Sequence, residues 1–243
     1  MRFIFVILIS SLAYLALAQD ASSTLSSIID AYENRNEERE EIWPMNSDRD
    51  LENEQTLLDS LNQILVGMEM DSLSDAELIN KEMLELIIGD RLYHLNFESH
   101  TFPLNAEGGF LAGIIYRIRS TRINNNKAFE KYIQRLKALP KYFDQRKKQM
   151  RLGQSQGKSS PKLVVNNCIN LIDQFLNTDV GKTFFDNVAS EPEQKREIAK
   201  VLIEEVRPAY QDFQNFLTKE YLYNAPEAIG ISEIRDGKAF YEQ

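Results

Sequence analysis

The chain has 243 residues, with 28 Lys or Arg against 37 Asp or Glu, so its formal net charge at pH 7 is −9. Hydrophobic residues make up 43%, which excludes a disordered chain and leaves enough apolar residues for a buried core. The acidic total disfavours a nucleic-acid partner, because nucleic-acid-binding surfaces are normally basic. The single cysteine, Cys168, excludes an intrachain disulfide.

The N-terminus carries the pattern of a secretory signal peptide. Arg2 precedes an apolar run over residues 3–9, and Ala16-Leu17-Ala18 supplies a small-x-small cleavage pattern before Gln19. We expect cleavage between Ala18 and Gln19. The alternative, a membrane anchor, is disfavoured because the apolar run is short.

Two segments follow from this cleavage: a signal peptide over residues 1–18 and a helical domain over residues 19–243. We expect the mature chain to be secreted to the extracellular space or to another exported compartment. No other apolar stretch approaches membrane-spanning length, so no membrane association is expected after cleavage.

Charge is distributed unevenly along the chain. Residues 19–110 hold 21 acidic and 5 basic residues. Residues 111–160 hold 2 acidic and 13 basic residues, and residues 161–243 hold 14 acidic and 9 basic residues. The basic middle segment has two interpretations, a patch for an anionic ligand or helices that lie beside acidic ones and cancel their charge. We favour the second.

Apolar residues recur at steps of three and four through most of the chain, which predicts helices with one buried face each. Alternating strand patterns are nearly absent, so the predicted fold class is all-α, a bundle-like array of helices. Each apolar stripe is expected to be buried against a partner. The stripes are Leu57, Leu61, Ile64, Leu65, Met68; Ile79, Met83, Leu86, Ile87; Phe129, Ile133, Leu136; Val165, Cys168, Ile172, Phe175; and Ile198, Leu202, Val206, Ala209, Phe213, Phe216.

Helix boundaries are marked by capping and breaking residues. Ser74-Asp-Ala-Glu77 is a capping box, Glu191-Pro192 marks another start, and Ser160-Pro161 reads as an N-cap followed by a proline at the first helical position. Pro208 falls inside the longest stripe and predicts a kink or two separate helices. A glycine-bearing loop is expected over residues 96–109. The remaining boundary signals are a start at Thr178 and breaks at Pro44, Pro140, Gly153 and Gly157.

Motifs for catalysis are absent from the sequence. No His-Glu-x-x-His pair is present, and the two histidines, His94 and His100, lie six residues apart with Glu98 between them. A Glu98/His100 metal pair is conceivable, but histidines bonded to a neighbouring backbone group are commoner. Cys168 lies on an apolar helix face and is interpreted as a small buried hydrophobe. No catalytic residue, metal ligand or cofactor is therefore assigned.

Several segments in fixed order resemble the family known as domain of unknown function 885. The resemblance is most specific at residues 95–104 (Leu-Asn-Phe-Glu-Ser-His-Thr-Phe-Pro-Leu) and covers about 185 residues. The other segments are residues 107–110, 132–145, 150–153 with Gly157, 161–165, 216–222, 229–231 and 236–241.

The resemblance implies a zinc-metallopeptidase-like protein built from two helical halves around a groove. Zinc and the general base belong to a His-Glu-x-x-His helix in the C-terminal half of such proteins. The segments found here match the N-terminal half, so no zinc ligand is carried over and zinc is expected only in full-length relatives. His94, His100 and Arg117 are retained as candidates for the groove wall.

Three hypotheses about function follow. The first is a secreted, truncated family member that lacks the zinc site and is inactive alone, with peptide substrate or the missing C-terminal half as partner. The second is a secreted helical binding module or pseudoenzyme. The third is an enzyme with an unrecognised site near His94, Glu98 and His100. The apolar residues of the tail after Tyr223 favour the first, because no later helix is available to bury them.

Overall fold

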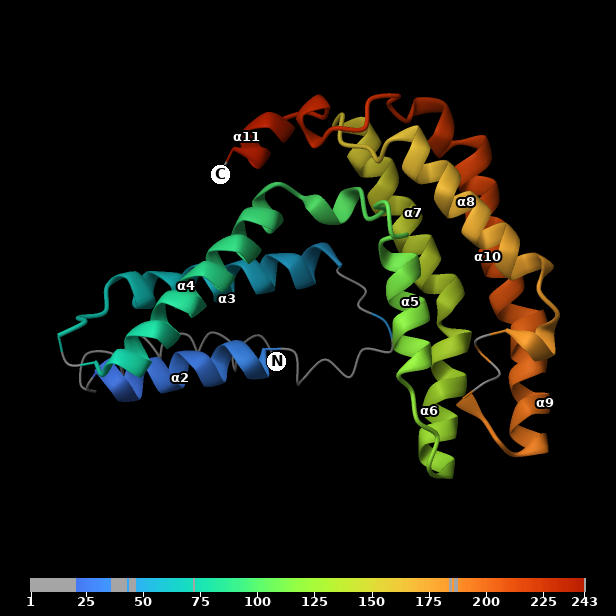
Figure 1. Ribbon diagram of the computed structural model, residues 1–243, viewed down its shortest axis with the longest axis horizontal. Coiled ribbons are helices and arrows are strands. Elements are labelled where there is room, and N and C mark those ends of the chain that lie inside the picture. Colours follow the sequence, from blue (N-terminus) through green and yellow to red (C-terminus); the bar gives the residue numbers. More distant parts are fainter. Residues whose placement is uncertain are drawn as a thin grey trace. The chain divides into compact units, whose positions relative to one another are not determined.

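The computed structural model describes residues 21–35, 43, 47–71, 73–183, 185 and 188–242. These residues form helices joined by loops and turns, and no strand occurs among them (Figure 1). The all-α prediction is confirmed. The predicted signal peptide, its cleavage site at Ala18 and Gln19, and the break at Pro44 lie outside the described residues. Within the described ranges, no helix is long and apolar enough to span a membrane.

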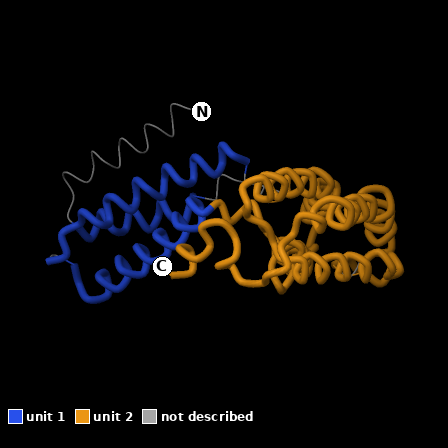
Figure 2. The backbone as a smooth tube through the Cα atoms, turned by 90° about the horizontal axis from the view of Figure 1, so that it is seen from above, with its two compact units in different colours: residues 1–41, 46–97 blue, residues 42–45, 98–243 orange. Residues whose placement is uncertain are grey.

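The backbone divides into two compact units (Figure 2). Unit 1 comprises Met1–Glu41 and Asn46–Phe97, and unit 2 comprises Ile42–Met45 and Glu98–Gln243. Each unit has a hydrophobic cluster of its own. The domain predicted over residues 19–243 therefore contains two cores.

Unit 1 is built from α2 (Ala21–Asn34), α3 (Asp48–Val66) and α4 (Asp75–Asn96). The predicted capping box of Ser74 and Glu77 is present at the start of α4, and a second one joins Ser47 and Asp50 at the start of α3. The buried members of the core are aliphatic, because the stripes of three helices meet there. They are Leu25, Ile28, Leu51, Leu58, Leu61, Leu65, Leu84, Ile88, Leu92 and Leu95.

One predicted stripe is not buried. Ile79, Met83, Leu86 and Ile87 of α4 are 58%, 54%, 74% and 44% exposed. The expectation that this stripe packs against a partner is wrong for the described residues. Its physical reason is that α4 is apolar on two faces, and the face bearing Leu84 and the three later core residues packs into the unit instead.

Unit 2 holds the remaining helices and the loop over residues 98–109. Its α-helices are α5 (Phe110–Arg119), α6 (Asn126–Lys137), α7 (Leu139–Ser155), α8 (Lys162–Asn177), α9 (Pro192–Val201), α10 (Arg207–Lys219) and α11 (Gly237–Tyr241). Shorter turns of helix are η1 (Ser99–Thr101), η2 (Val180–Lys182), η5 (Tyr221–Asn224) and η6 (Ile231–Glu233). The predicted loop between α4 and α5 contains η1 and otherwise agrees with the expectation.

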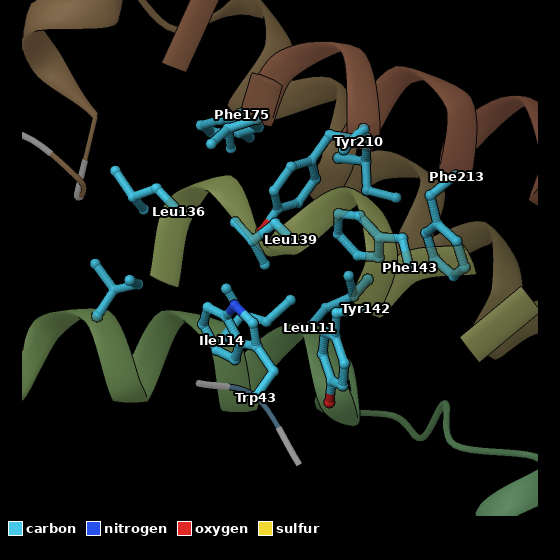
Figure 3. Packing of buried hydrophobic residues seen from close by; sticks show 14 of the residues in the cluster. Trp43, Leu111, Ile114, Leu136, Leu139, Tyr142, Phe143, Phe175, Tyr210 and Phe213 are labelled. Atoms are coloured by element: carbon cyan, nitrogen blue, oxygen red, sulfur yellow. The ribbon is translucent and has the colours of Figure 1, made fainter. Parts of the chain in front are cut away.

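The core of unit 2 is rich in aromatic rings (Figure 3). Phe213 of α10 stacks on Phe143 of α7 at 5.0 Å between ring centroids and meets Phe110 of α5 edge to face at 5.4 Å. Such ring pairs stabilise beyond the burial of their area. Cys168 is buried in the same cluster, and burial raises the pKa of its thiol to about 11, which agrees with its interpretation as a hydrophobe.

Pro208 alters the hydrogen-bonding pattern of the helical segment over residues 192–219, but the segment continues past it. A π-helical turn, η4 (Leu202–Val206), joins α9 to α10, and the Arg207 N–H donates to the Leu202 carbonyl five residues back. Proline lacks an N–H, so Pro208 cannot donate the α-helical hydrogen bond to the Glu204 carbonyl, and the π-helical turn lies just before it. The predicted kink or division therefore appears as a π-helical insertion.

Three boundary predictions need correction. Helix α8 begins at Lys162 with Pro161 as its N-cap residue, so Ser160 lies outside the helix and binds elsewhere. Thr178 ends α8 instead of starting a helix. Helix α7 continues through Gly153 to Ser155. The tail after Tyr223 is less loop-like than expected, since η6 and α11 lie within it.

Candidate functional site

Several of the segments that carry the family resemblance meet in unit 2. The loop over residues 98–109 lies against the last turn of α7, and the connection after α7 lies against η5. We take this junction as the candidate site. Its geometry follows from a few close backbone contacts.

Gly153 allows α7 to approach the loop. A Cβ atom at this position would lie 2.6 Å from the Thr101 carbonyl oxygen and 2.7 Å from the Lys158 carbonyl oxygen. Both are backbone atoms, so only glycine fits without a backbone shift. Gly109 has a similar role at the start of α5, because its φ is +59° and a Cβ would meet the Pro103 carbonyl oxygen at 2.0 Å.

Ser160 and Tyr221 join the other segments of the junction. The Ser160 hydroxyl donates to the Leu104 carbonyl at 3.1 Å, and the Ser160 N–H donates to the Tyr221 phenol oxygen at 2.9 Å. Gln154 donates from its side chain to the Tyr221 carbonyl at 2.8 Å. All of these groups are buried or partly buried, where such bonds satisfy polar atoms that water does not reach.

Glu98 is held in a left-handed backbone conformation, with φ +56°, at the entry to η1. Its carboxylate accepts hydrogen bonds from Lys158 at 2.9 Å and from Gln156 at 3.3 Å. The bond from Lys158 is the main cause that lowers the pKa of Glu98. The carboxylate is thus ionised and bound to side chains that connect the loop to the end of α7.

The two histidines belong to different units. His94 lies on α4 of unit 1, with its Nε2 3.8 Å from a carboxylate oxygen of Asp90, one turn earlier. His100 lies in η1 of unit 2, two residues after Glu98. Among the described residues, no group of three or more His, Cys, Asp or Glu side chains is arranged to hold a metal ion.

Arg117, the third groove candidate, lies in the last turn of α5, away from the junction in sequence. Its guanidinium carbon is 6.0 Å from the centroid of the Trp43 ring, within cation–π range. Trp43 is buried, stacks on Tyr142 at 5.5 Å between centroids and donates its indole N–H to the Arg135 carbonyl at 2.7 Å. Arg117 therefore belongs to a cluster around Trp43 that the sequence did not reveal.

Arg146 of α7 is another residue that sequence reasoning missed. It is 6% exposed and donates to the Gln149 side-chain oxygen at 2.9 Å and to the Tyr142 phenol at 3.0 Å. Its guanidinium also lies over the rings of Tyr142 and Phe110, at 4.9 and 5.6 Å. The sequence shows several basic residues over the range of α7 but does not indicate which of them is buried.

The fold and these contacts define the chain as an all-α protein of two compact units, with a loop–helix junction and a basic aromatic cluster in the second. The chain belongs to the family described as "Bacterial protein of unknown function (DUF885)", whose profile matches residues 29–243. This confirms the resemblance. No curated protein matches the chain significantly.

One solved structure resembles the chain closely in fold. It is described as "The crystal structure of the putative lipoprotein from Colwellia psychrerythraea", with a TM-score of 0.64 and 20% sequence identity. The match covers 79% of this chain and 37% of that protein. The chain thus spans well under half the length of this structural relative.

Proposed function

We propose that residues 19–243 form the helical, non-catalytic part of an exported, metallopeptidase-like protein of this family. In this proposal the chain contributes one wall of a peptide-binding groove and does not hydrolyse peptides without a metal-binding part. The observation that carries the proposal is the apolar outer face of α4, formed by Ile79, Met83, Leu86 and Ile87.

This outer face has the properties of a surface that packs against more protein. Its four large apolar side chains follow one another at helical spacing and are between 44% and 74% exposed. Contiguous exposed apolar side chains usually mark an interaction site, whereas isolated ones do not. The match to 37% of the Colwellia protein supports the presence of further protein in such an architecture.

The charges beside the stripe help to select its partner. Glu82 and Asp90 are exposed on the same helix. Helices that lie on membranes carry Lys and Arg beside their apolar face, so these acids disfavour a lipid surface. They also disfavour a second copy of the same helix, because like charges would face each other. A polypeptide with an apolar face and basic edges fits best.

The first test compares the two faces of α4 by two single substitutions in the chain of residues 19–243. Leu86→Gln is expected to keep the cooperative unfolding transition and to reduce aggregation, measured by light scattering. Leu84→Gln, on the buried face, is expected to remove the transition of unit 1. Equal destabilisation by both substitutions would contradict an unpartnered outer face.

A second candidate function is a self-sufficient binding module, favoured by the separate hydrophobic core in each unit. It predicts a monomer with a cooperative thermal transition and no aggregation, measured by sedimentation and circular dichroism. Persistent aggregation or a molten spectrum would support the incomplete architecture instead.

Metal content tests the remaining hypothesis, an unrecognised enzyme site near His94, Glu98 and His100. Both proposals above expect no stoichiometric zinc in the purified chain. Tight zinc binding that His100→Ala abolishes would overturn both proposals and favour an enzyme.

A further inference from the structure

Two arginines of unit 2 contact Trp43, Arg117 through its guanidinium and Arg135 through its backbone carbonyl. Trp43 lies in the aromatic core with its indole N–H bonded to the Arg135 carbonyl (Figure 3). Arg117 lies over the same indole ring at 6.0 Å. One buried tryptophan therefore contacts a residue from each of α5 and α6.

Thr121 connects the two arginines directly. Its hydroxyl donates to the Arg117 carbonyl at 2.8 Å and accepts a bond from the Arg135 guanidinium at 2.9 Å. This bond fixes the Arg135 side chain toward the end of α5. The Arg135 guanidinium is thus held by a hydrogen bond to Thr121, and both arginines are half-buried.

Among the residues that the structure describes, no carboxylate neutralises Arg135. Burial lowers the pKa of Arg135, the charge of Arg117 lowers it further, and only Tyr132 opposes these effects. None of these groups is a carboxylate. The Arg135 Nε is buried and has no hydrogen-bond partner among the residues that the structure describes. A buried donor and two like charges both cost free energy until an anion is present.

Helix dipoles account for part of this arrangement. Arg117 and Arg135 lie in the last turns of α5 and α6, where the helix dipole favours a cation. Arg119 has the same position on α5 but is exposed and lacks these contacts. The dipole therefore explains neither the bond between the Arg135 guanidinium and Thr121 nor the position of Arg117 over the Trp43 ring.

We propose that Arg117 and Arg135 bind an oxyanion, either a carboxylate or a phosphate group of a ligand. Guanidinium groups present paired N–H donors that match both kinds of oxyanion. Thr121 positions Arg135, and the buried Trp43 ring packs beside Arg117. This site rests on unit 2 alone and is independent of the proposed groove wall.

The experiment measures the thermal unfolding of the purified chain with succinate, with inorganic phosphate, and with sodium chloride at matched ionic strength. We expect succinate or phosphate, at ten times its Kd, to raise the Tm by roughly 3–6 °C above the chloride control. The anion that raises the Tm shows whether the site prefers a carboxylate or a phosphate group. Isothermal titration with the same anion gives the Kd.

Three variants locate the binding. Arg117→Gln and Arg135→Gln are expected to weaken the anion response at least tenfold in Kd. Arg119→Gln removes one positive charge from the same helix turn as Arg117→Gln. This control variant is expected to keep the wild-type response to the anion. Without anion, Arg117→Gln is expected to keep or raise the Tm, because it relieves repulsion on Arg135.

Two results would overturn the site. One is a wild-type Tm that responds equally to chloride, succinate and phosphate. The other is an equal loss of response in Arg119→Gln and Arg117→Gln, which would show general screening of a basic surface. Arg117→Gln keeps the test decisive if Arg135→Gln fails to fold.

Discussion

Units 1 and 2 bury their apolar residues in different ways. Unit 1 packs three helices around aliphatic side chains and leaves a second apolar face of α4 exposed. Unit 2 has a larger core that contains stacked and edge-to-face rings. Arg146 and the Trp43 indole are buried there, and each makes hydrogen bonds. Unit 2 therefore has the more specific interior, whereas unit 1 keeps an exposed apolar helix face among its described residues.

The largest expected effect comes from the aromatic core of unit 2. Phe213→Ala removes a fully buried ring that contacts Phe110 and Phe143, so we expect a loss of roughly 3–5 kcal/mol in the free energy of unfolding. Chemical denaturation measures it. Tyr223→Ala is the control, because Tyr223 is 87% exposed and should change stability by less than about 0.5 kcal/mol.

Chemical denaturation of Leu58→Ala gives the corresponding test for the aliphatic core of unit 1. Leu58 is fully buried among aliphatic side chains, so a loss of roughly 2–5 kcal/mol is expected. If the two cores are independent, each substitution shifts a different part of the unfolding curve. A single transition shifted by both would contradict independent cores.

Two glycines give opposite predictions in the two units. Gly153→Ala places a Cβ against backbone oxygens in unit 2 and should destabilise by roughly 1–3 kcal/mol. Gly89→Ala on α4 meets nothing within 4 Å and should stabilise by roughly 0.5–1 kcal/mol, because alanine favours a helix over glycine. Thermal unfolding of both variants checks the signs, and two changes of the same sign would contradict the described packing.

Local signals in the sequence predicted the fold better than the site. The capping box of Ser74 and Glu77 and the helix start at Pro192 depend on neighbouring residues only, and both are present. Pro208 predicted a disturbed helix, but its form as a π-helical turn depends on how α9 and α10 continue. The exposed stripe of α4 was mispredicted because a period of 3.6 residues shows that a face is apolar, not which of two apolar faces is buried.

The candidate site depended on tertiary contacts that the sequence does not contain. Arg117 was selected as a groove candidate, but its neighbours Trp43 and Arg135 are distant in the chain and were not. Ser160 was interpreted as an N-cap, whereas its hydroxyl binds the Leu104 carbonyl. Family resemblance marked the residues of the loop–helix junction without indicating that Gly153 allows the close approach.

The smallest predicted effect concerns Glu77, which joins two helices of unit 1. The side-chain hydrogen bond from Ser22 of α2, followed by the bonds from Ser74, lowers the pKa of Glu77 from 4.5 to about 2. A carboxyl group with a lowered pKa in the folded state adds stability above its ordinary pKa of 4.5. That stability is lost as the pH falls from about 4.5 to about 2.

Thermal unfolding between pH 7 and pH 2 measures this contribution. Glu77→Gln should lower the Tm at pH 7, and its difference from the wild type should vanish toward pH 2. Ser22→Ala should reproduce part of the effect, since it removes the largest cause of the lowered pKa. Glu82→Gln, on an exposed position of the same helix, controls for the loss of a surface charge. A pH-independent difference for Glu77→Gln would mean that its hydrogen bonds, and not its ionisation, join α2 to α4.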